Sequence, residues 1–409
     1  MRAQTLFLLV TFLLTTASGL TARAQERFCP DGNARILRVE MYPFVPNADE
    51  IALKIKELFE AGCPGLDLQI RMNANYYSTG DGGILAADAD VYEVDSVFFD
   101  DFLKRRSPKL PSQSVLETAG AVVPFAKDIA TSGGAQFGIP HWICTEFLIY
   151  KKALSQIGAI KGPADAARVF AELGKGPLMD LIGPTTLGEL YLSVLVARYG
   201  SAGGALKHLD PDHLDDYAVA VLRNFISMEP PGFGRDRDYH RRDGFYARQF
   251  ARGGGSAFVG YSEDTYYTLN ETAQSCLKGQ CLGEDDLDVA LWPFADEGAK
   301  PVAWVDMYMM DSRLTDAKLR DAEAYIKFMM SVSTYETLIL PSDGAPDGVP
   351  KYLLPARDDV YSDGKMASAP LYPKFRSLIG SAIPVTEEGL NDKLHKTAEA
   401  LEKVLPAGH

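Results

Sequence analysis

Residues 137–150 read FGIPHWICTEFLIY, a Gly-x-Pro turn followed by an apolar run typical of a strand. The run continues directly into a second structural unit that begins at Lys151. This continuity predicts that the chain crosses here from one lobe to another, with Cys144 in the crossing segment. A thiol in that position would face a space between lobes and is a candidate nucleophile, and a buried, inert cysteine is the other interpretation.

Upstream of the crossover, strands alternate with helices. Apolar periodicity predicts strands at 36–42, 66–72 and 89–95, and a helix at 49–61 between the first two. Ser96 is a candidate cap for the helix that follows the third strand. This order is typical of an α/β lobe with a mostly parallel sheet, and Asp95 would then lie at the carboxyl end of a strand, where open α/β sheets bind ligands.

Downstream of the crossover, helical patterns dominate before strands return. Helices are predicted at 164–173, 187–199, 214–228, 244–251, 318–330 and 386–404, and strands at 256–261, 287–294 and 302–310. The late return to strands predicts that the chain crosses back into the first lobe. The expected fold is therefore α/β with two lobes, like a type II periplasmic binding protein, each lobe a mostly parallel sheet flanked by helices and the active site between them.

The predicted lobes are each discontinuous in sequence. The N-terminal lobe would take residues 25–140 plus about 300–345, and the C-terminal lobe 141–299 plus about 346–409. Residues 1–24 resemble a secretory signal, with Arg2, an apolar run and the small-x-small site that ends at Ala24. We expect cleavage after Ala24 and a secreted or periplasmic protein with no membrane span.

Five cysteines in an exported chain predict disulfides. Cys276 and Cys281 flank a turn-like spacer, and Cys29 and Cys63 are a second possible pair, although spacing does not fix connectivity. This pairing would leave Cys144 as the free thiol. The formal net charge of −14 argues against nucleic-acid binding, and the histidines and cysteines lack metal-site spacing, so no metal or other cofactor is expected.

The stretch GGGSAFVGYSED at 253–264 reads as a glycine turn, a buried strand and a polar corner where a helix begins near Ser262. Glu263 in that corner is a candidate for proton transfer, and a partner for the helix dipole is the alternative. Aromatic residues near the predicted strand ends suit the stacking of a flat heterocycle, and acidic residues there would accept hydrogen bonds from exocyclic amines. The aromatic residues are Tyr42, Phe44, Tyr76, Tyr77, Tyr261, Tyr266, Tyr267 and Trp304, with packing in the core as the alternative role, and the acidic residues are Asp95 and Asp306.

These segments together resemble bacterial thiaminase I, also called thiamine pyridinylase, over most of the chain. The resemblance rests on MYPFVP at 41–46, DVYEVDSVF at 90–98, VPF at 123–125, the 137–150 crossover, AFVGYSE at 257–263 and YLLPAR at 352–357. It implies that Cys144 is the nucleophile and Glu263 the base. It also implies a pyrimidine site made of Tyr42, Tyr77, Asp95, Tyr261 and Asp306.

The chain departs from the family at several aromatic positions. Trp304 and Phe44 stand where the family has tyrosines, so stacking is kept and a hydroxyl is lost. Near residue 245 the spacing differs by one, and either Phe245 or Tyr246 takes the place of another family tyrosine.

The resemblance implies a transferase that acts on thiamine and a small organic nucleophile, an amine or a thiol. Cys144 would add to the pyrimidine ring, the thiazole would be expelled, and the nucleophile would replace it at the methylene carbon. A monomer is expected. Two alternatives stay open: a non-catalytic binding protein for thiamine or its pyrimidine, and a hydrolytic thiaminase that uses water.

Overall fold

A computed structural model describes most of the chain. The described residues are Cys29, Phe233 and residues 35–80, 82–183, 186–231, 244–275, 282–295, 300–342, 348–380 and 382–406, without the side chains of 272–275. The predicted signal segment and the predicted Cys276–Cys281 bridge lie outside these residues.

The described strands form two main sheets. The first sheet has the strand order β12-β6-β11-β3-β1-β2, with β13 beside β11, and the second has the order β10-β7-β9-β8. The strands of the first sheet are β1 (Arg35–Met41), β2 (Leu66–Met72), β3 (Val91–Asp95), β6 (Ile139–Cys144), β11 (Val302–Met310), β12 (Leu354–Pro355) and β13 (Ile383–Pro384). Those of the second are β7 (Phe147–Lys151), β8 (Pro177–Leu178), β9 (Ala257–Gly260) and β10 (Leu287–Leu291), and β4 (Thr131–Ser132) and β5 (Ala135–Gln136) form a separate hairpin.

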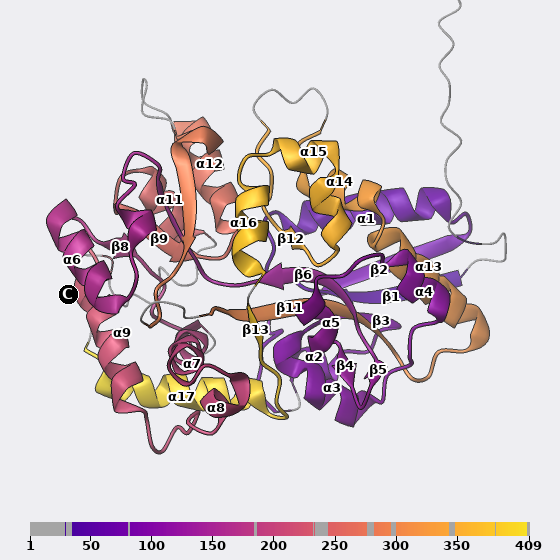
Figure 1. Ribbon diagram of the computed structural model, residues 1–409. Coiled ribbons are helices and arrows are strands. Elements are labelled where there is room, and N and C mark those ends of the chain that lie inside the picture. Colours follow the sequence, from indigo (N-terminus) through magenta and orange to yellow (C-terminus); the bar gives the residue numbers. More distant parts are fainter. Residues whose placement is uncertain are drawn as a thin grey trace, which may run out of the picture.

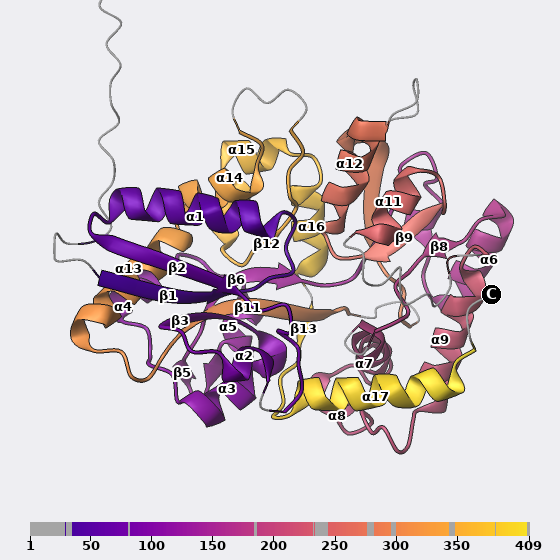
Figure 2. The ribbon, with the colours of Figure 1, turned by 180° about the vertical axis from the view of Figure 1, so that it is seen from behind.

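The longer helices occupy predicted segments, whereas several of the shorter ones were not predicted. They are α1 (Ala48–Gly62), α2 (Gly83–Ala86), α3 (Phe99–Arg106), α4 (Gln113–Thr118), α5 (Pro124–Ile129), α6 (Pro163–Leu173), α7 (Thr186–Tyr199), α8 (Ala202–Leu206), α9 (Asp216–Met228), α11 (Phe245–Ala251), α12 (Asp264–Ser275), α13 (Asp316–Met329), α14 (Val332–Ile339), α15 (Gly364–Ser368), α16 (Tyr372–Ile379) and α17 (Leu390–Val404). In Figures 1 and 2, α1 runs along one face of the first sheet and α2 and α3 lie on the other.

Ser96 is not the predicted helix cap. The Asp95 side chain instead accepts a hydrogen bond from the backbone N–H of Val97 at 2.9 Å and caps a short 3-10 turn at Ser96–Phe98. The Ser96 hydroxyl is buried and accepts from the backbone N–H of Val305 on β11 at 3.0 Å. The side chain one residue earlier already accepts from the free N–H of Val97, so the serine is available to join two strands.

The predicted crossover is confirmed, because β6 belongs to the first sheet and β7, which follows after two residues, belongs to the second. β11 returns from β10 of the second sheet to the middle of the first, and Figure 1 shows β6 and β11 side by side between the two parts of the molecule. Gly138 precedes β6 where a Cβ would overlap the side chain of Met307 on β11, so this close approach requires glycine.

The expectation of mostly parallel sheets is wrong, because both sheets are mixed. β1 pairs in parallel with β2 and β3, whereas β11 is antiparallel to β3 and β6, and β7 is antiparallel to β9 and β10. The reason is the two crossings. β3 and β6 run toward the second sheet, while β11 arrives from it and must run the opposite way. The limits predicted for the two lobes stay a prediction.

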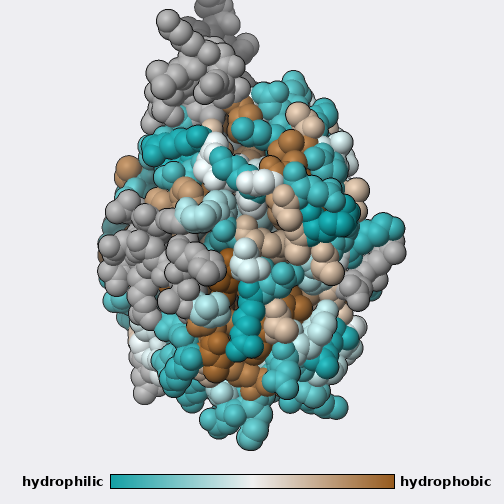
Figure 3. All heavy atoms as spheres, turned by 90° about the vertical axis from the view of Figure 1, so that its left-hand side faces the viewer, coloured by the Kyte–Doolittle hydropathy of each residue, from teal (hydrophilic) through white to brown (hydrophobic). Residues whose placement is uncertain are grey.

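Apolar side chains fill the space around both sheets, and Cys29 and Cys63 form the predicted disulfide near the start of the fold. At the end of the molecule formed by the second sheet, most of the surface is hydrophilic and the hydrophobic side chains gather near the middle of the face (Figure 3). Within the described part of the chain, no helix has the length and apolar character needed to cross a membrane.

Candidate functional site

Four predicted site residues lie where the first sheet meets the second. In the strand register, Cys144 on β6 is opposite Trp304 on β11, and Asp306 on β11 is opposite Asp95 on β3. Opposed residues on neighbouring strands share a face of the sheet, as do residues two apart on one strand. The thiol, the indole and the two carboxyls therefore project from one face, and Trp304 is 3% exposed with no hydrogen-bond partner for its Nε1 among the described residues.

Two tyrosines extend this group away from the sheet. The hydroxyl of Tyr77 donates to Oδ2 of Asp95 at 2.5 Å, and the hydroxyls of Tyr42 and Tyr77 are 2.9 Å apart. Phe44 stacks on the Tyr77 ring with a centroid distance of 5.7 Å and is 46% exposed. This chain of hydrogen bonds fixes both rings beside the paired aspartates.

Asp95 and Asp306 form a pair of like charges within the sheet. Burial raises the pKa of Asp95, although the Tyr77 hydroxyl and the Val97 N–H favour its charged form. Burial raises the pKa of Asp306 well above its usual value, and the charges of Asp95, Glu93 and Glu263 add to the effect. The raised pKa values favour the protonated forms of the pair, and a bound cation or hydrogen-bond donor would favour the charged forms.

A second carboxyl on β3 has different surroundings. Glu93 is 2% exposed, and its Oε1 lies 2.5 Å from Nδ1 of His141, while its Oε2 accepts from the N–H of Tyr42 at 3.0 Å. Burial lowers the pKa of His141, so the neutral imidazole donates its Nδ1–H to the carboxylate. Sequence analysis did not single out this pair. Its Glu93 carboxyl holds the backbone of Tyr42 in place through the hydrogen bond from the Tyr42 N–H.

Cys144 is the described cysteine that has no disulfide, and it is partly exposed. Burial raises the pKa of its thiol well above the usual value, and the charges of Glu263, Asp306, Asp95 and Glu189 raise it further, with Glu263 the strongest of these. A thiol in these surroundings is protonated at neutral pH and becomes nucleophilic only when a base removes its proton or a cation enters.

Glu263 comes from the second lobe, in the corner between β9 and α12. It is 9% exposed, and burial, followed by the charge of Asp264, raises its pKa to about 8. The Ser262 hydroxyl donates to its Oε2 at 3.2 Å. The β6–β7 crossing thus brings a thiol of one sheet into the electrostatic reach of a carboxyl of the other.

Glu189 is a member of this group that sequence analysis missed. It lies on α7, is 5% exposed, and its Oε2 accepts a hydrogen bond from the Tyr261 hydroxyl at 2.7 Å. Burial raises its pKa to about 8, and the charges of Asp95 and Glu146 contribute. The signal was present, because Glu189 is the acidic residue in the mostly apolar part of this helix, and a buried acid needs a polar partner.

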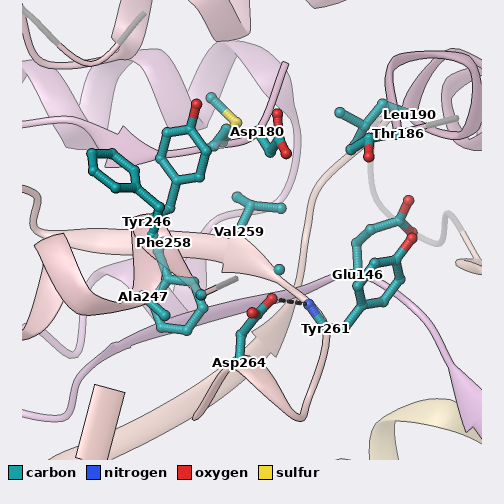
Figure 4. Close-up of a pocket in the computed structure, with 14 residues that line it drawn as sticks. Glu146, Asp180, Thr186, Leu190, Tyr246, Ala247, Phe258, Val259, Tyr261 and Asp264 are labelled. Carbon is teal, nitrogen blue, oxygen red and sulfur yellow. Dashed lines mark hydrogen bonds between the residues drawn. The ribbon is translucent and has the colours of Figure 1, made fainter. Parts of the chain in front are cut away.

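A cavity of about 190 Å³ lies beside this group, in the second lobe. Figure 4 shows Tyr246 and Asp180 at one end of it and Glu146 and Tyr261 at the other, with Val259 between. The structure therefore brings Tyr246 and Tyr261 to one cavity. Phe245 lines it as well, so the structure does not distinguish between the two candidates for the family tyrosine.

Buried carboxyls whose pKa values are raised surround the thiol, and the charged groups with the largest effect on the pKa of Cys144 are all acidic. Such a site favours a cationic ligand with a flat ring, and it combines a nucleophile with groups that exchange protons near neutral pH. Among the residues that the structure describes, no group of three or more His, Cys, Asp or Glu side chains is arranged to hold a metal ion.

Comparisons with known proteins show which sequences and folds this chain is similar to. Residues 148–276 match the family model described as Thiaminase-1 domain. Thiaminase-1 of Paenibacillus thiaminolyticus is 27% identical over 91% of this chain and 88% of its own length.

Solved structures show the same fold. Thiaminase I from Bacillus thiaminolyticus superposes with a TM-score of 0.75 at 23% identity, covering 91% of this chain and all of that one. Clostridium botulinum thiaminase I in complex with thiamin gives 0.74 at 20% identity, covering 90% and 99%. A maltose-bound protein of T. maritima gives 0.63 at 16% identity, covering 91% and 100%, so the fold is that of two-lobe binding proteins. In sequence and in fold, the chain is therefore similar to thiaminase I enzymes.

Proposed function

We propose that the protein is a secreted transferase that degrades thiamine. Cys144 adds to the pyrimidine ring, the thiazole leaves, and an amine or thiol replaces it at the methylene carbon. The observation that carries the proposal is the free thiol of Cys144 within the electrostatic reach of the Glu263 carboxyl, among further buried acids. The similar C. botulinum protein was solved with thiamin bound, which supports the choice of substrate.

The chemistry requires each of these groups. Direct displacement at the methylene of thiamine is slow, whereas addition of a thiolate to the pyrimidine pushes electrons toward the methylene and expels a neutral thiazole. Glu263 takes the thiol proton and later returns it. The positive thiazolium lowers the pKa of both Cys144 and Glu263 on entry, so the substrate itself promotes formation of the thiolate.

The other predicted residues hold the pyrimidine. Asp95 and Asp306 accept hydrogen bonds from its exocyclic amine, and Tyr42 and Tyr77 orient Asp95 through the hydroxyl chain. Trp304 provides an apolar wall beside Cys144, and Tyr246 and Tyr261 contact the ring from the side where the second-lobe cavity begins. We expect no cofactor, and we place the protein outside the cell or in the periplasm after cleavage near Ala24.

Mass spectrometry of thiamine incubated with pyridine and the purified protein tests the proposal. The wild type should form pyrimidinylmethyl-pyridinium and free thiazole, and Cys144→Ser should form neither. Intact thiamine with a ligand-dependent rise in melting temperature would favour a non-catalytic binding protein, which the shared fold with sugar-binding proteins makes the second candidate. A hydroxymethyl product in the presence of pyridine would indicate hydrolysis.

A further inference from the structure

The cavity beside Cys144 contains a buried carboxyl that the proposed mechanism does not use. Glu146 is 4% exposed, and neither of its side-chain oxygens has a hydrogen-bond partner in suitable geometry among the described residues. The hydroxyl of Ser193 is close enough to lower its pKa, yet it too is buried and lacks such a partner. Leaving a buried carboxyl without partners is destabilising, and such an arrangement is expected where a ligand supplies the missing contact.

Glu146 lines the cavity and is close to Cys144 along the backbone. It follows Cys144 by two residues, a span of at most roughly 7 Å along the chain. Phe147 pairs with Gly260 in the second sheet, so Glu146 comes opposite Tyr261. The charge of Glu146 raises the pKa of both Tyr261 and Glu189, which confirms that the three side chains are neighbours. Figure 4 shows Glu146 beside Tyr261 at the edge of the cavity.

The remaining walls suit a small flat molecule. The cavity of about 190 Å³ is lined by Phe245, Tyr246 and Phe258, together with the aliphatic Val259 and Leu190. Aromatic walls favour a flat ring, and the Glu146 carboxyl at one end favours a nitrogen that carries hydrogen, while Asp180 lies at the opposite end.

We infer that this cavity holds the acceptor nucleophile, an aromatic amine with an N–H group, and that Glu146 takes the proton which the amine loses. The inference rests on the proposed function and names the second substrate of that site. The lone pair of the amine forms the C–N bond at the methylene carbon. Departure of the thiazole leaves a double bond between the methylene carbon and the pyrimidine ring. When the amine adds, this double bond returns its electrons to the ring and the bond to the Cys144 sulfur breaks. One N–H proton then passes to the Glu146 carboxylate.

The thiazolium of thiamine is the other group that the Glu146 end of the cavity would attract. It carries a permanent charge and has no N–H proton to lose, so a proton acceptor gives it no advantage. Burial raises the pKa of Glu146 to about 7, which suits a group that gains and loses a proton in each turnover. This property favours the acceptor over the thiazolium as the occupant of the cavity.

Two acceptors of similar size and basicity separate these roles. Aniline must lose an N–H proton to give a neutral product, whereas pyridine has none to lose. We expect Glu146→Gln to lower kcat/KM for aniline relative to pyridine by about 10²-fold, measured as the ratio of the two adducts when both acceptors compete for thiamine. Glu40→Gln is the matched control, because Glu40 is also 4% exposed with a pKa raised by burial but lies on β1, away from the cavity, and it should keep the wild-type ratio.

The outcomes are distinct. An unchanged ratio in a folded Glu146→Gln protein would overturn the inference, and a rise in KM for thiamine with an unchanged ratio would assign the cavity to the thiazolium. Wild type that forms no adduct with either acceptor would instead overturn the proposed function. If Glu146→Gln does not fold, Glu146→Asp carries the test, because its shorter carboxyl should restore only part of the aniline preference. A full wild-type ratio in that variant would contradict the inference.

Discussion

Glu93 and Asp95 lie two residues apart on β3 and are both almost completely buried, but the protein surrounds them differently. Glu93 has His141 at 2.5 Å and the N–H of Tyr42 at 3.0 Å, so the fold itself compensates its charge. Asp95 is opposite Asp306, another acid, and the pKa values of both are raised.

This difference separates a structural carboxyl from a binding one. Buried charges are ordinarily paired, because an uncompensated charge in a protein interior is costly. A pair of acids that face each other is therefore stable only as a proton-sharing pair or with a cationic ligand. We expect changes to Glu93 to affect folding and changes to the Asp95 group to affect binding and catalysis.

The largest effect should come from Glu263, which belongs with the uncompensated acids. Because its pKa is raised to about 8, its basic form is lost as the pH falls below about 8, and kcat/KM for thiamine should rise with pH through that value. Glu263→Gln should lower kcat/KM by about 10²–10⁴-fold and abolish this pH dependence. Stopped assays of thiazole release across pH measure both, and a variant within twofold of wild type would contradict the assignment.

Asp306→Asn tests the like-charge pair itself. The substitution keeps the shape of the side chain and removes the like charge that lies opposite Asp95, so the melting temperature should stay the same or rise. Loss of a charged hydrogen-bond acceptor should raise KM for thiamine about 10–100-fold. Thermal unfolding and initial rates on the same preparation check the two expectations. A clear fall in melting temperature with a normal KM would make Asp306 a structural carboxyl and contradict its place in the binding group.

Glu93→Gln should show the opposite pattern. It removes a carboxylate that accepts from both His141 and the N–H of Tyr42, and the free energy of unfolding should fall by about 1–3 kcal/mol. Urea denaturation gives this value. If stability is unchanged while thiamine binding is lost, Glu93 belongs to the binding group after all.

Tyr261→Phe should have the smallest effect. The change removes the hydroxyl that donates to Glu189 at 2.7 Å and keeps the ring. Since a neutral hydrogen bond contributes about 0.5–1.5 kcal/mol, KM for thiamine should rise about 2–10-fold with little change in kcat. Steady-state kinetics measure this change, and a kcat loss as large as that of Glu263→Gln would give the hydroxyl a direct part in the chemistry.

Much of the fold could be predicted because its signals are local. Apolar periodicity located β1, α1, β2 and β11 to within about two residues, and the uninterrupted run around Cys144 indicated the crossover. The direction of β11 could not be predicted in this way, because it depends on which side of the first sheet the chain re-enters. Ser96 was assigned as a cap from its residue type alone, whereas the cap depends on Asp95 in the folded chain.

The candidate site could be predicted only where a residue pattern marked it. Cys144 and Glu263 stood in recognisable strings, and the structure places them near each other. Glu146 lay within the same string but received no role, because nothing in the sequence shows that its carboxyl is buried without partners. Glu189 lies 45 residues from Cys144 in the chain, and only the packing of α7 against the junction of the sheets brings it to Tyr261.

The most direct test of the account is the mass of the intact protein after rapid acid quenching of a reaction with thiamine and no added acceptor. We predict an increase equal to one pyrimidinylmethyl group, located by peptide mapping to the segment that contains Cys144, with one equivalent of thiazole released. Thiazole release from a protein of unchanged mass, or an adduct on a residue other than Cys144, would contradict the central claim that the free thiol between the two sheets attacks the substrate.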